Sequence, residues 1–326
     1  MKTALITGIS GQDGSYLASF LLGNGYQVVG QTRGGANGGF PNLRYLGIES
    51  KVPVQAVDLL DFVAVQRMLQ DVQPDEVYHL SADNSVQRSF QHPLETLEYN
   101  LLSVFHLLEA LRQADKKCRF FFAGSSEMFG KVERSPVSLS TPIHPINPYG
   151  VSKASGFLGV QQFREAFGLF AVSGVLFPHE SLLRKEGFFV RKVIEGAWEI
   201  KNGRKDVLRV GNLDQKRDFG YASEYVKAMW LMLQPQEPRD FLIASGKAIS
   251  LRRVVEHVFG RLGVSLQKVV VDPSLFRPAD VEEIVGDPFP IRRELGWEYD
   301  LDFEQVLDTM IQGKLDEKGE KGGAFH

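Results

Sequence analysis

The stretch GISGQDG at residues 8–14 decides the fold, together with the segments on either side of it. Residues 2–7 are typical of a short buried strand, and the apolar spacing of residues 15–22 predicts a helix. Residues 27–32 predict a second strand. A strand, a glycine turn, a helix and a strand within about thirty residues is the context in which this pattern binds a dinucleotide.

The glycines in this stretch explain how such a ligand would be held. They let the backbone turn tightly and approach a pyrophosphate, whose charge is favoured at a helix N-terminus. An ordinary glycine turn is the alternative that the sequence leaves open. The residues predicted to bind the cofactor here are Gly8, Ser10, Gly11, Gln12, Asp13 and Gly14.

The end of the second strand indicates which dinucleotide is bound. An acidic residue there would bond to the ribose 2′-hydroxyl and repel a 2′-phosphate. Arg33 follows the strand instead, and the glycine-rich residues 34–39 come next with no acid nearby. NADP is therefore predicted in preference to NAD, with a solvated surface arginine as the open alternative. Asp58, after the third strand, is predicted to meet the adenine edge.

Two further patterns indicate the chemistry. Tyr149 and Lys153 stand four residues apart, so on a helix the ammonium lies on the same face as the phenol and favours the phenolate. Such a base beside a nicotinamide can oxidise a secondary alcohol. Ser125, at the end of a predicted strand, can hydrogen-bond that alcohol. Glu127 adds a second acid/base that simple alcohol oxidation does not need, unless it only caps the following turn.

Composition excludes several other classes of protein. The chain has 326 residues and a net charge of −3, which gives no reason to expect nucleic acid or an anionic membrane surface. Its single cysteine, Cys118, cannot form an internal disulfide, so a reducing cytoplasm is expected. No segment reaches the ~18 apolar residues that span a bilayer. The seven histidines show no metal-ligand spacing, and no metal is expected.

Strand and helix patterns alternate through the first half of the chain. We predict an α/β fold, a doubly wound parallel sheet of the Rossmann-like kind, with a smaller, mainly C-terminal substrate lobe. Further expected strands are residues 76–81, 119–125 and 169–177, and further expected helices are residues 100–111, 149–167 and 225–233. The expected division is an NADP-binding domain over residues 1–175, joined by segments around 214–245, a substrate lobe over 176–313 and a mobile tail over 314–326.

The chain resembles the GDP-mannose 4,6-dehydratases, a family of extended short-chain dehydrogenases/reductases, from residue 7 to about residue 297. The stretches that carry the resemblance are TGISGQDGSYL (7–17), SEMFG (126–130), FPHES (177–181), GNLDQKRDFG (211–220) and FRPADVE (276–282). Tyr149 with Lys153 marks only the superfamily. The last two stretches are more specific, because in this family they help to hold the GDP-sugar.

The resemblance implies a redox-neutral reaction. The cofactor takes the hydride from C4 of the hexose while Tyr149 removes the hydroxyl proton, Lys153 tunes Tyr149 and Ser125 orients the oxygen. Glu127 then removes the C5 proton and protonates the departing C6 hydroxyl, and the returned hydride gives a 4-keto-6-deoxy sugar. The resemblance also implies cofactor contacts from Leu59, Leu80, Tyr149, Lys153 and His179. It implies substrate contacts from Ser85, Glu127, Pro178, Glu180, Arg184, Lys192, Arg217, Arg277 and Asp280.

The chain departs from the family pattern at several positions. Ser125 replaces a threonine, Pro178 an asparagine, and Leu182 and Leu183 a proline and an arginine. The substrate could therefore be another GDP-sugar, such as a GDP-heptose. An NAD(P)H-dependent reductase of a GDP-4-keto-6-deoxy sugar and a non-catalytic nucleotide-binding protein are the competing interpretations. The family resemblance also implies a homodimer or homotetramer.

Overall fold

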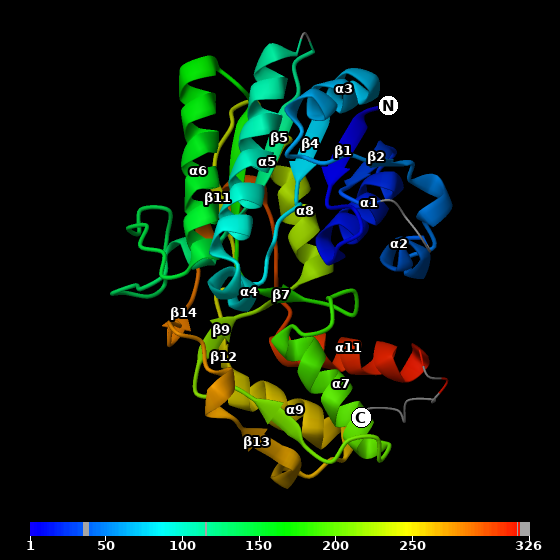
Figure 1. Cartoon of the computed structure of the whole chain (residues 1–326), viewed down its shortest axis with the longest axis vertical. Helices are drawn as coiled ribbons and strands as arrows, with labels where there is room; N and C mark the ends of the chain where they lie inside the picture. Colours follow the sequence, from blue (N-terminus) through cyan, green and yellow to red (C-terminus); the bar gives the residue numbers. More distant parts are fainter. Residues whose placement is uncertain (35–38, 115, 318, 320–326) are drawn as a thin grey trace.

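The computed structural model describes residues 1–34, 39–114, 116–317 and 319. Its centre is a parallel sheet of seven strands in the order β11-β6-β5-β4-β1-β2-β3 (Figure 1). The strands are β1 (Thr3–Thr7), β2 (Gln27–Thr32), β3 (Val54–Ala56), β4 (Glu76–His79), β5 (Arg119–Ser125), β6 (Ala171–Leu176) and β11 (Phe241–Ile243). The doubly wound α/β prediction is confirmed. The strand order reverses between β1 and β4, and ligands bind at the carboxyl ends of strands at such a point.

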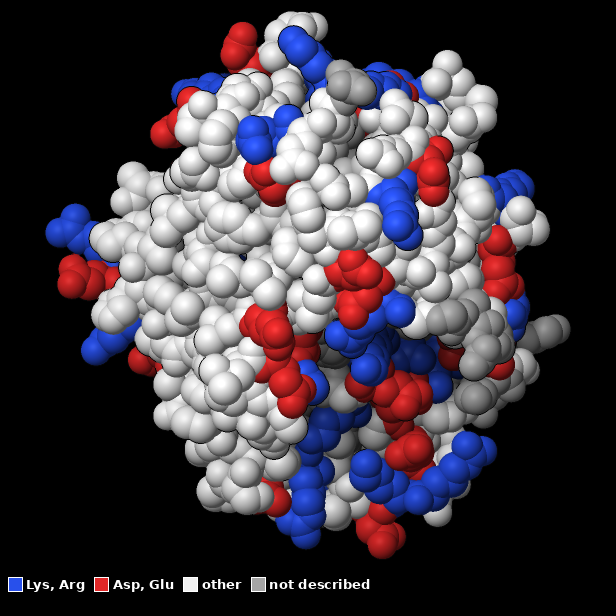
Figure 2. All heavy atoms as spheres, turned by 45° about the horizontal axis from the view of Figure 1, so that its top comes forward, with Lys and Arg blue, Asp and Glu red and all other residues white. Residues whose placement is uncertain are grey.

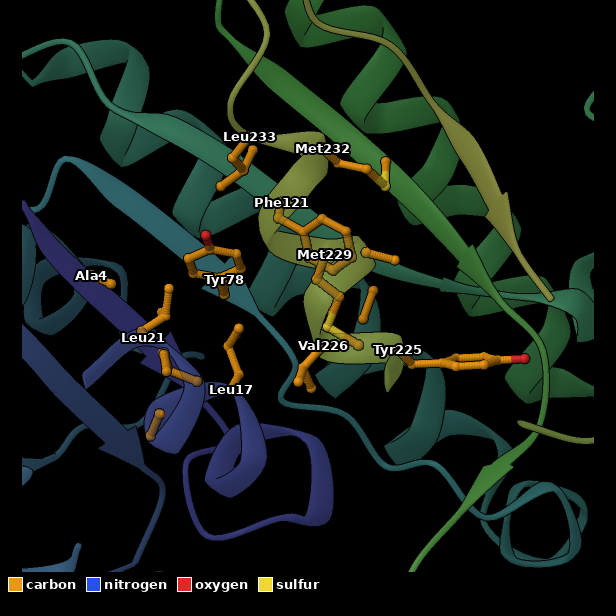
Figure 3. Close-up of a cluster of buried hydrophobic side chains, with 14 of the residues drawn as sticks. Ala4, Leu17, Leu21, Tyr78, Phe121, Tyr225, Val226, Met229, Met232 and Leu233 are labelled. Carbon is orange, nitrogen blue, oxygen red and sulfur yellow. The ribbon is translucent and has the colours of Figure 1, made fainter. Parts of the chain in front are cut away.

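Helices cover both faces of this sheet. One face carries α1 (Gln12–Gly23) and α8 (Ala222–Met232), and the other carries α3 (Phe62–Val72), α5 (Pro93–Gln113) and α6 (Pro148–Phe167). Figure 3 shows the apolar layer on the first face, where Leu17 and Leu21 of α1 meet Val226 and Met229 of α8. This layer joins segments that are about 200 residues apart, so α8 packs in space with the first half of the chain.

A smaller lobe lies below the carboxyl ends of the strands (Figure 1). Its helices α7 (Phe189–Lys201), α9 (Leu251–Leu262) and α11 (Phe303–Glu317) share one apolar core. Its short sheets pair β8 (Leu208–Val210) with β13 (Val269–Val271), and β9 (Lys216–Asp218) with β12 (Ala248–Ser250) and β14 (Glu283–Ile284). Between the two halves, β7 (His179–Glu180) pairs with β10 (Gly220–Tyr221). The remaining helices are α2 (Pro41–Tyr45), α4 (Val86–Gln91) and α10 (Phe289–Leu295), with single 3₁₀ turns at Glu49–Lys51, Ser126–Met128, Leu266–Lys268 and Pro273–Leu275.

The structure corrects some predicted boundaries. The strand predicted over residues 76–81 ends at His79, because the next two backbone N–H groups donate to the Thr7 hydroxyl instead of to a strand. The mobile tail predicted from residue 314 is wrong in its first residues, since α11 continues to Glu317. The Lys314 ammonium is buried and lies 2.6 Å from the Glu195 carboxylate of α7. The rest of that prediction, residues 320–326, lies outside the described residues, as do residues 35–38 of the glycine-rich loop.

Within the described ranges, none of the helices has the length and apolar character needed to cross a lipid bilayer.

Candidate active site

The glycine turn between β1 and α1 leaves no room for side chains. Gly8 has a φ of +71°, and a Cβ there would lie 2.9 Å from the Cα of Ser81. A Cβ on Gly14 would lie 2.5 Å from the Gly8 carbonyl oxygen. Gly11 caps α1, and its N–H donates to the same oxygen over 3.0 Å. Exposed backbone at a helix N-terminus, without side chains in front of it, is a cradle that fits a pyrophosphate.

A buried hydroxyl supports this turn from below. The Thr7 hydroxyl accepts from the N–H groups of Leu80 and Ser81, each at 3.2 Å, and donates to Nδ1 of His79 over 2.8 Å. Burial lowers the pKa of His79 to about 3, so the ring is neutral. The predicted cofactor residue Leu80 is thus fixed by its backbone. The sequence analysis did not predict a role for Thr7 or His79. The one indication in the sequence is that each is a polar residue at the end of a buried strand.

Three predicted cofactor residues from distant parts of the sequence contact one another at the start of α1. Nε2 of His179 lies 3.0 Å from both carboxylate oxygens of Asp13. Burial alone would raise the pKa of Asp13 and lower that of His179, but their mutual attraction outweighs it, so the pKa of Asp13 is lowered and that of His179 is raised. Gln12 joins the pair, because its amide donates to the His179 carbonyl over 3.2 Å and accepts from the Ser181 hydroxyl over 2.8 Å.

The residues at the ribose end are more exposed. The Arg33 guanidinium stacks on the ring of Tyr99, 4.7 Å from its centroid. The Tyr99 hydroxyl in turn lies 2.6 Å from the hydroxyl of Ser81. Asp58 is exposed and accepts from the Leu60 N–H over 3.1 Å, so it is free to meet a ligand on its other side. The remaining cofactor predictions are Leu59, which is fully buried, and Ser10, which is exposed and whose carbonyl accepts from Asn42 over 3.1 Å.

Ser125, Tyr149 and Lys153 come together where β5 ends and α6 begins. Burial raises the pKa of Tyr149 to about 12, and a hydrogen bond with Ser125 opposes this rise. The Lys153 ammonium donates to the Ala123 carbonyl over 2.7 Å and lies 5.8 Å from the centroid of the Tyr149 ring. Burial lowers the pKa of Lys153 to about 7. The tyrosine is therefore a poor base on its own, and its ionisation depends on a nearby cation.

Glu127 lies half-buried beside this group. Burial raises the pKa of Tyr149, and the charge of Glu127 adds to that rise. Burial lowers the pKa of Arg217, and the charges of Asp280 and Glu127 oppose that fall. The Asn147 amide donates to Glu127 Oε2 over 2.7 Å. The turn at Glu127 is capped by Ser125, whose hydroxyl accepts from the Glu127 N–H over 3.3 Å. The capping role considered for the Glu127 side chain is therefore filled by another residue.

On the lobe side, Arg217 and Arg277 converge on one carboxylate. Asp280 accepts from Nη2 of Arg217 over 2.6 Å and from Nη1 of Arg277 over 3.5 Å. Arg217 is buried on β9, whereas Arg277 is exposed. Figure 2 shows Lys and Arg side chains gathered with Asp and Glu in the lower half of one face, while the middle left of that face carries few charges. Arg217 and Arg277 give this part of the site the positive charge that an anionic ligand needs.

A second acid–base pair on the lobe side is incompletely bonded. The Nε of Arg184 lies 3.7 Å from Oε1 of Glu180, and the guanidinium stacks on Phe188, 3.8 Å from the ring centroid. Burial raises the pKa of Glu180. Among the described residues, Glu180 Oε2 and Arg184 Nε have no hydrogen-bond partner, although both atoms are buried. Such orphaned groups next to His179 are typical of a ligand site.

Three further predicted substrate residues have contacts with other parts of the chain. Ser85 caps α4 by accepting from the Arg88 N–H over 3.2 Å. The Pro178 carbonyl accepts from the Gly220 N–H over 2.8 Å, which ties β7 to β10. Lys192 lies on α7, where burial lowers its pKa, Lys205 lowers it further and Asp272 opposes the change. Their contacts do not connect them to Glu127 or Tyr149.

A family model described as GDP-mannose 4,6 dehydratase matches residues 5–310. The GDP-mannose 4,6-dehydratase of Vibrio cholerae serotype O1 is 38% identical over an alignment of 351 positions, which covers 97% of this chain and 94% of that protein. GDP-mannose 4,6 dehydratase 2 of Arabidopsis thaliana is 38% identical over 326 residues, which cover 97% of this chain and 87% of that protein.

Solved structures with the same fold include sugar-nucleotide enzymes crystallised with NAD. UDP-glucose 4-epimerase of Thermus thermophilus, in complex with NAD, has a TM-score of 0.84 and 25% identity, covering 95% of this chain and 98% of that one. The dTDP-glucose 4,6-dehydratase DesIV of Streptomyces venezuelae has a TM-score of 0.86 and 20% identity, covering 97% and 98%. The second likeness concerns the fold alone.

Proposed function

The chain belongs to the GDP-mannose 4,6-dehydratase family, and from this we propose that it is a lyase that converts GDP-mannose, or a close GDP-sugar, to the 4-keto-6-deoxy sugar. The observation that carries the proposal is the position of Glu127, whose Oε2 accepts from Asn147, the residue that caps the helix carrying Tyr149. Oxidation of an alcohol needs only the Ser125, Tyr149 and Lys153 group. A carboxylate next to that group provides the second acid/base that elimination of water requires.

Each residue has a role that follows from its position. When bound, the nicotinamide supplies the acceptor for the hydride of C4 and returns it to C6. Tyr149 takes the proton of the C4 hydroxyl, whose oxygen is oriented by Ser125. The Lys153 ammonium makes this transfer possible near neutral pH, because it stabilises the phenolate. Glu127 removes the C5 proton, which the adjacent C4 ketone acidifies, and protonates the C6 hydroxyl, which leaves as water. As the hydride reaches C6, a proton returns to C5, and this uptake balances the release of the proton that Tyr149 took from the C4 hydroxyl.

The proposed reaction has a direct test against the competing reductase. A dehydratase regenerates its cofactor in each turnover, so the purified chain should convert GDP-mannose completely without added reduced cofactor. A reductase would instead consume one reduced cofactor for each 4-keto sugar that it converts. Product is measured by chromatography of the nucleotide sugars. Failure of GDP-mannose and related GDP-sugars to react would remove the proposed function.

We further propose that NADP is the preferred cofactor. Arg33 lies at the end of β2 and no acidic residue lies there in the described part of the loop. Arg33→Asp should lower the affinity for NADP by about ten- to a hundredfold, because it replaces a charge-assisted hydrogen bond to the 2′-phosphate by repulsion. The affinity for NAD should change much less. Both are measured by fluorescence titration.

Arg33→Lys is the matched control for that substitution. It keeps the positive charge but not the planar stack on Tyr99, so most of the preference for NADP should remain. Equal affinity of the native protein for the two dinucleotides would show that Arg33 has only the structural contact with Tyr99.

The two arginines around Asp280 support GDP as the nucleotide part of the substrate. GDP at a hundred times its Kd should stabilise the fold by about 2.7 kcal/mol and raise Tm by a few degrees. Arg277→Ala should reduce that shift and leave the shift caused by NADP unchanged. Arg293→Ala removes an exposed arginine that pairs with Glu294 on α10, and should leave both shifts intact. Equal stabilisation by UDP would contradict the assignment of guanine.

The chain is also proposed to form a homodimer or homotetramer. Three apolar side chains on neighbouring helices are exposed, Leu102 on α5 and Val151 and Leu158 on α6. Exposed apolar residues on the outer surface of two packed helices are typical of a surface that another subunit covers. Sedimentation of the purified chain, whose mass is 36.5 kDa, gives the state directly.

A further inference from the structure

Asn147 connects two parts of the candidate site through one amide. Its Oδ1 accepts from the Gly150 N–H over 2.7 Å, which caps α6 at the turn that carries Tyr149. Its Nδ2 donates to Oε2 of Glu127, also over 2.7 Å. The residue is only 4% exposed; its bond to Gly150 is buried and its bond to Glu127 is partly buried. The signal in the sequence is an asparagine directly before Pro148, the usual start of a helix.

The backbone around Glu127 is fitted to the same turn. A Cβ on Gly150 would lie 2.5 Å from the Glu127 carbonyl oxygen, so the first turn of α6 packs directly on this residue. Among the described residues, Glu127 Oε1 has no hydrogen-bond partner, whereas Oε2 is held by Asn147. One carboxylate oxygen is therefore anchored and the other is available to a substrate. The titratable groups that interact with Glu127 are the neutral phenol of Tyr149 from α6 and the guanidinium of Arg217 from β9.

We propose that Asn147 is a positioning residue, which holds the Glu127 carboxylate at a fixed place relative to Tyr149. Elimination can then follow oxidation on the same bound sugar. The proposal rests on the proposed dehydratase function. The amide has two roles that no charged side chain of this length can combine. Its oxygen accepts from the helix, and its nitrogen gives a charge-assisted bond to a carboxylate.

Asn147→Asp separates the two roles with almost no change in shape. Aspartate is as good a helix cap as asparagine, so Tm should stay close to that of the native protein. It places a second carboxylate against Glu127, and two carboxylates that share a site retain a proton to higher pH. At neutral pH, product formation should fall by about ten- to a hundredfold. The acidic limb of the kcat profile should move to higher pH, because Glu127 must be ionised to take the C5 proton.

Two controls accompany this variant. Asn147→Ser keeps a cap on α6 without adding charge, so it should retain the native Tm and lose less activity than Asn147→Asp. Ser250→Ala removes a cap of the same kind from α9, where the Ser250 hydroxyl accepts from the Arg253 N–H over 3.1 Å. It should lower Tm without changing the pH profile.

The decisive measurement is the absorbance of reduced nicotinamide during turnover. In Asn147→Asp it should accumulate, because oxidation at C4 proceeds while elimination is slowed. A native pH profile and native turnover in Asn147→Asp would overturn the proposal and leave Asn147 as a helix cap. A loss of activity that comes with a lower Tm and an unmoved pH profile would also overturn it. Inactivity of the native chain with GDP-sugars would refute the proposed function itself. Assaying the native chain first distinguishes that outcome from a failure of the proposal for Asn147.

Discussion

Glu127→Gln should lower the rate of product formation by about 10²–10⁴-fold while C4 oxidation continues, so that absorbance of the reduced cofactor accumulates with GDP-mannose. The reason is that glutamine keeps the size of the side chain and can still accept from Asn147, but it cannot take or deliver a proton. In the native protein the same absorbance should be transient. Rapid-mixing absorbance and product chromatography measure the two steps separately.

A matched control for Glu127→Gln lies a few residues further along. Glu133 is exposed in the loop after the turn that carries Glu127, and Glu133→Gln should leave both steps at the native rate. If Glu127→Gln still formed product at nearly the native rate, the carboxyl would have no part in elimination, and the reductase alternative would gain support.

Tyr149→Phe should block both steps, with product formation lower by about 10³-fold or more and no accumulation of reduced cofactor. The substitution removes the hydroxyl that bonds to Ser125 and leaves the buried ring in place. The variant should therefore keep its fold, its Tm and its affinity for GDP. Accumulation of reduced cofactor in this variant would mean that another group removes the C4 proton.

The pH dependence of the same step follows from the two buried groups. Burial raises the pKa of Tyr149 to about 12. A cation beside a phenol favours the phenolate, so we expect the Lys153 ammonium to oppose this rise. Lys153→Met removes the ammonium, so the pKa of Tyr149 should rise and the acidic limb of the rate of C4 oxidation should move to higher pH. Activity at neutral pH should fall and recover in part in alkaline buffer. An unmoved limb would show that Lys153 acts only through its bond to the Ala123 carbonyl.

Some of this site could be predicted because it depends on local sequence. The glycine turn needs small residues at fixed spacing, and Tyr149 and Lys153 need only one helix. Other contacts depend on how distant segments pack. The bond between Asp13 and His179 joins residues that are 166 apart, and no periodicity in the sequence indicates it. Only the family resemblance placed His179 near the cofactor.

Prediction from the sequence was also inaccurate at the ends of helices and strands, because these ends depend on contacts that apolar spacing does not show. The strand that was expected to reach residue 81 stops at His79 because a side-chain hydroxyl, that of Thr7, competes for the next backbone N–H groups. The helix expected over residues 100–111 begins at Pro93, where proline is favourable in the first turn. A side-chain bond to the backbone decided one boundary and a proline in the first turn decided the other, and neither is visible in apolar spacing.

The apolar layer between α1 and α8 has a consequence for how the protein is made. During translation, Leu17 and Leu21 emerge early, but their partners Val226 and Met229 are synthesised much later. The nascent chain must therefore carry an uncovered apolar helix face until residues 222–232 have left the ribosome. Exposed surfaces of this kind are where chaperones bind. We therefore expect the first half of the chain, although it carries the glycine turn and Tyr149, to complete its packing only after α8 has been made.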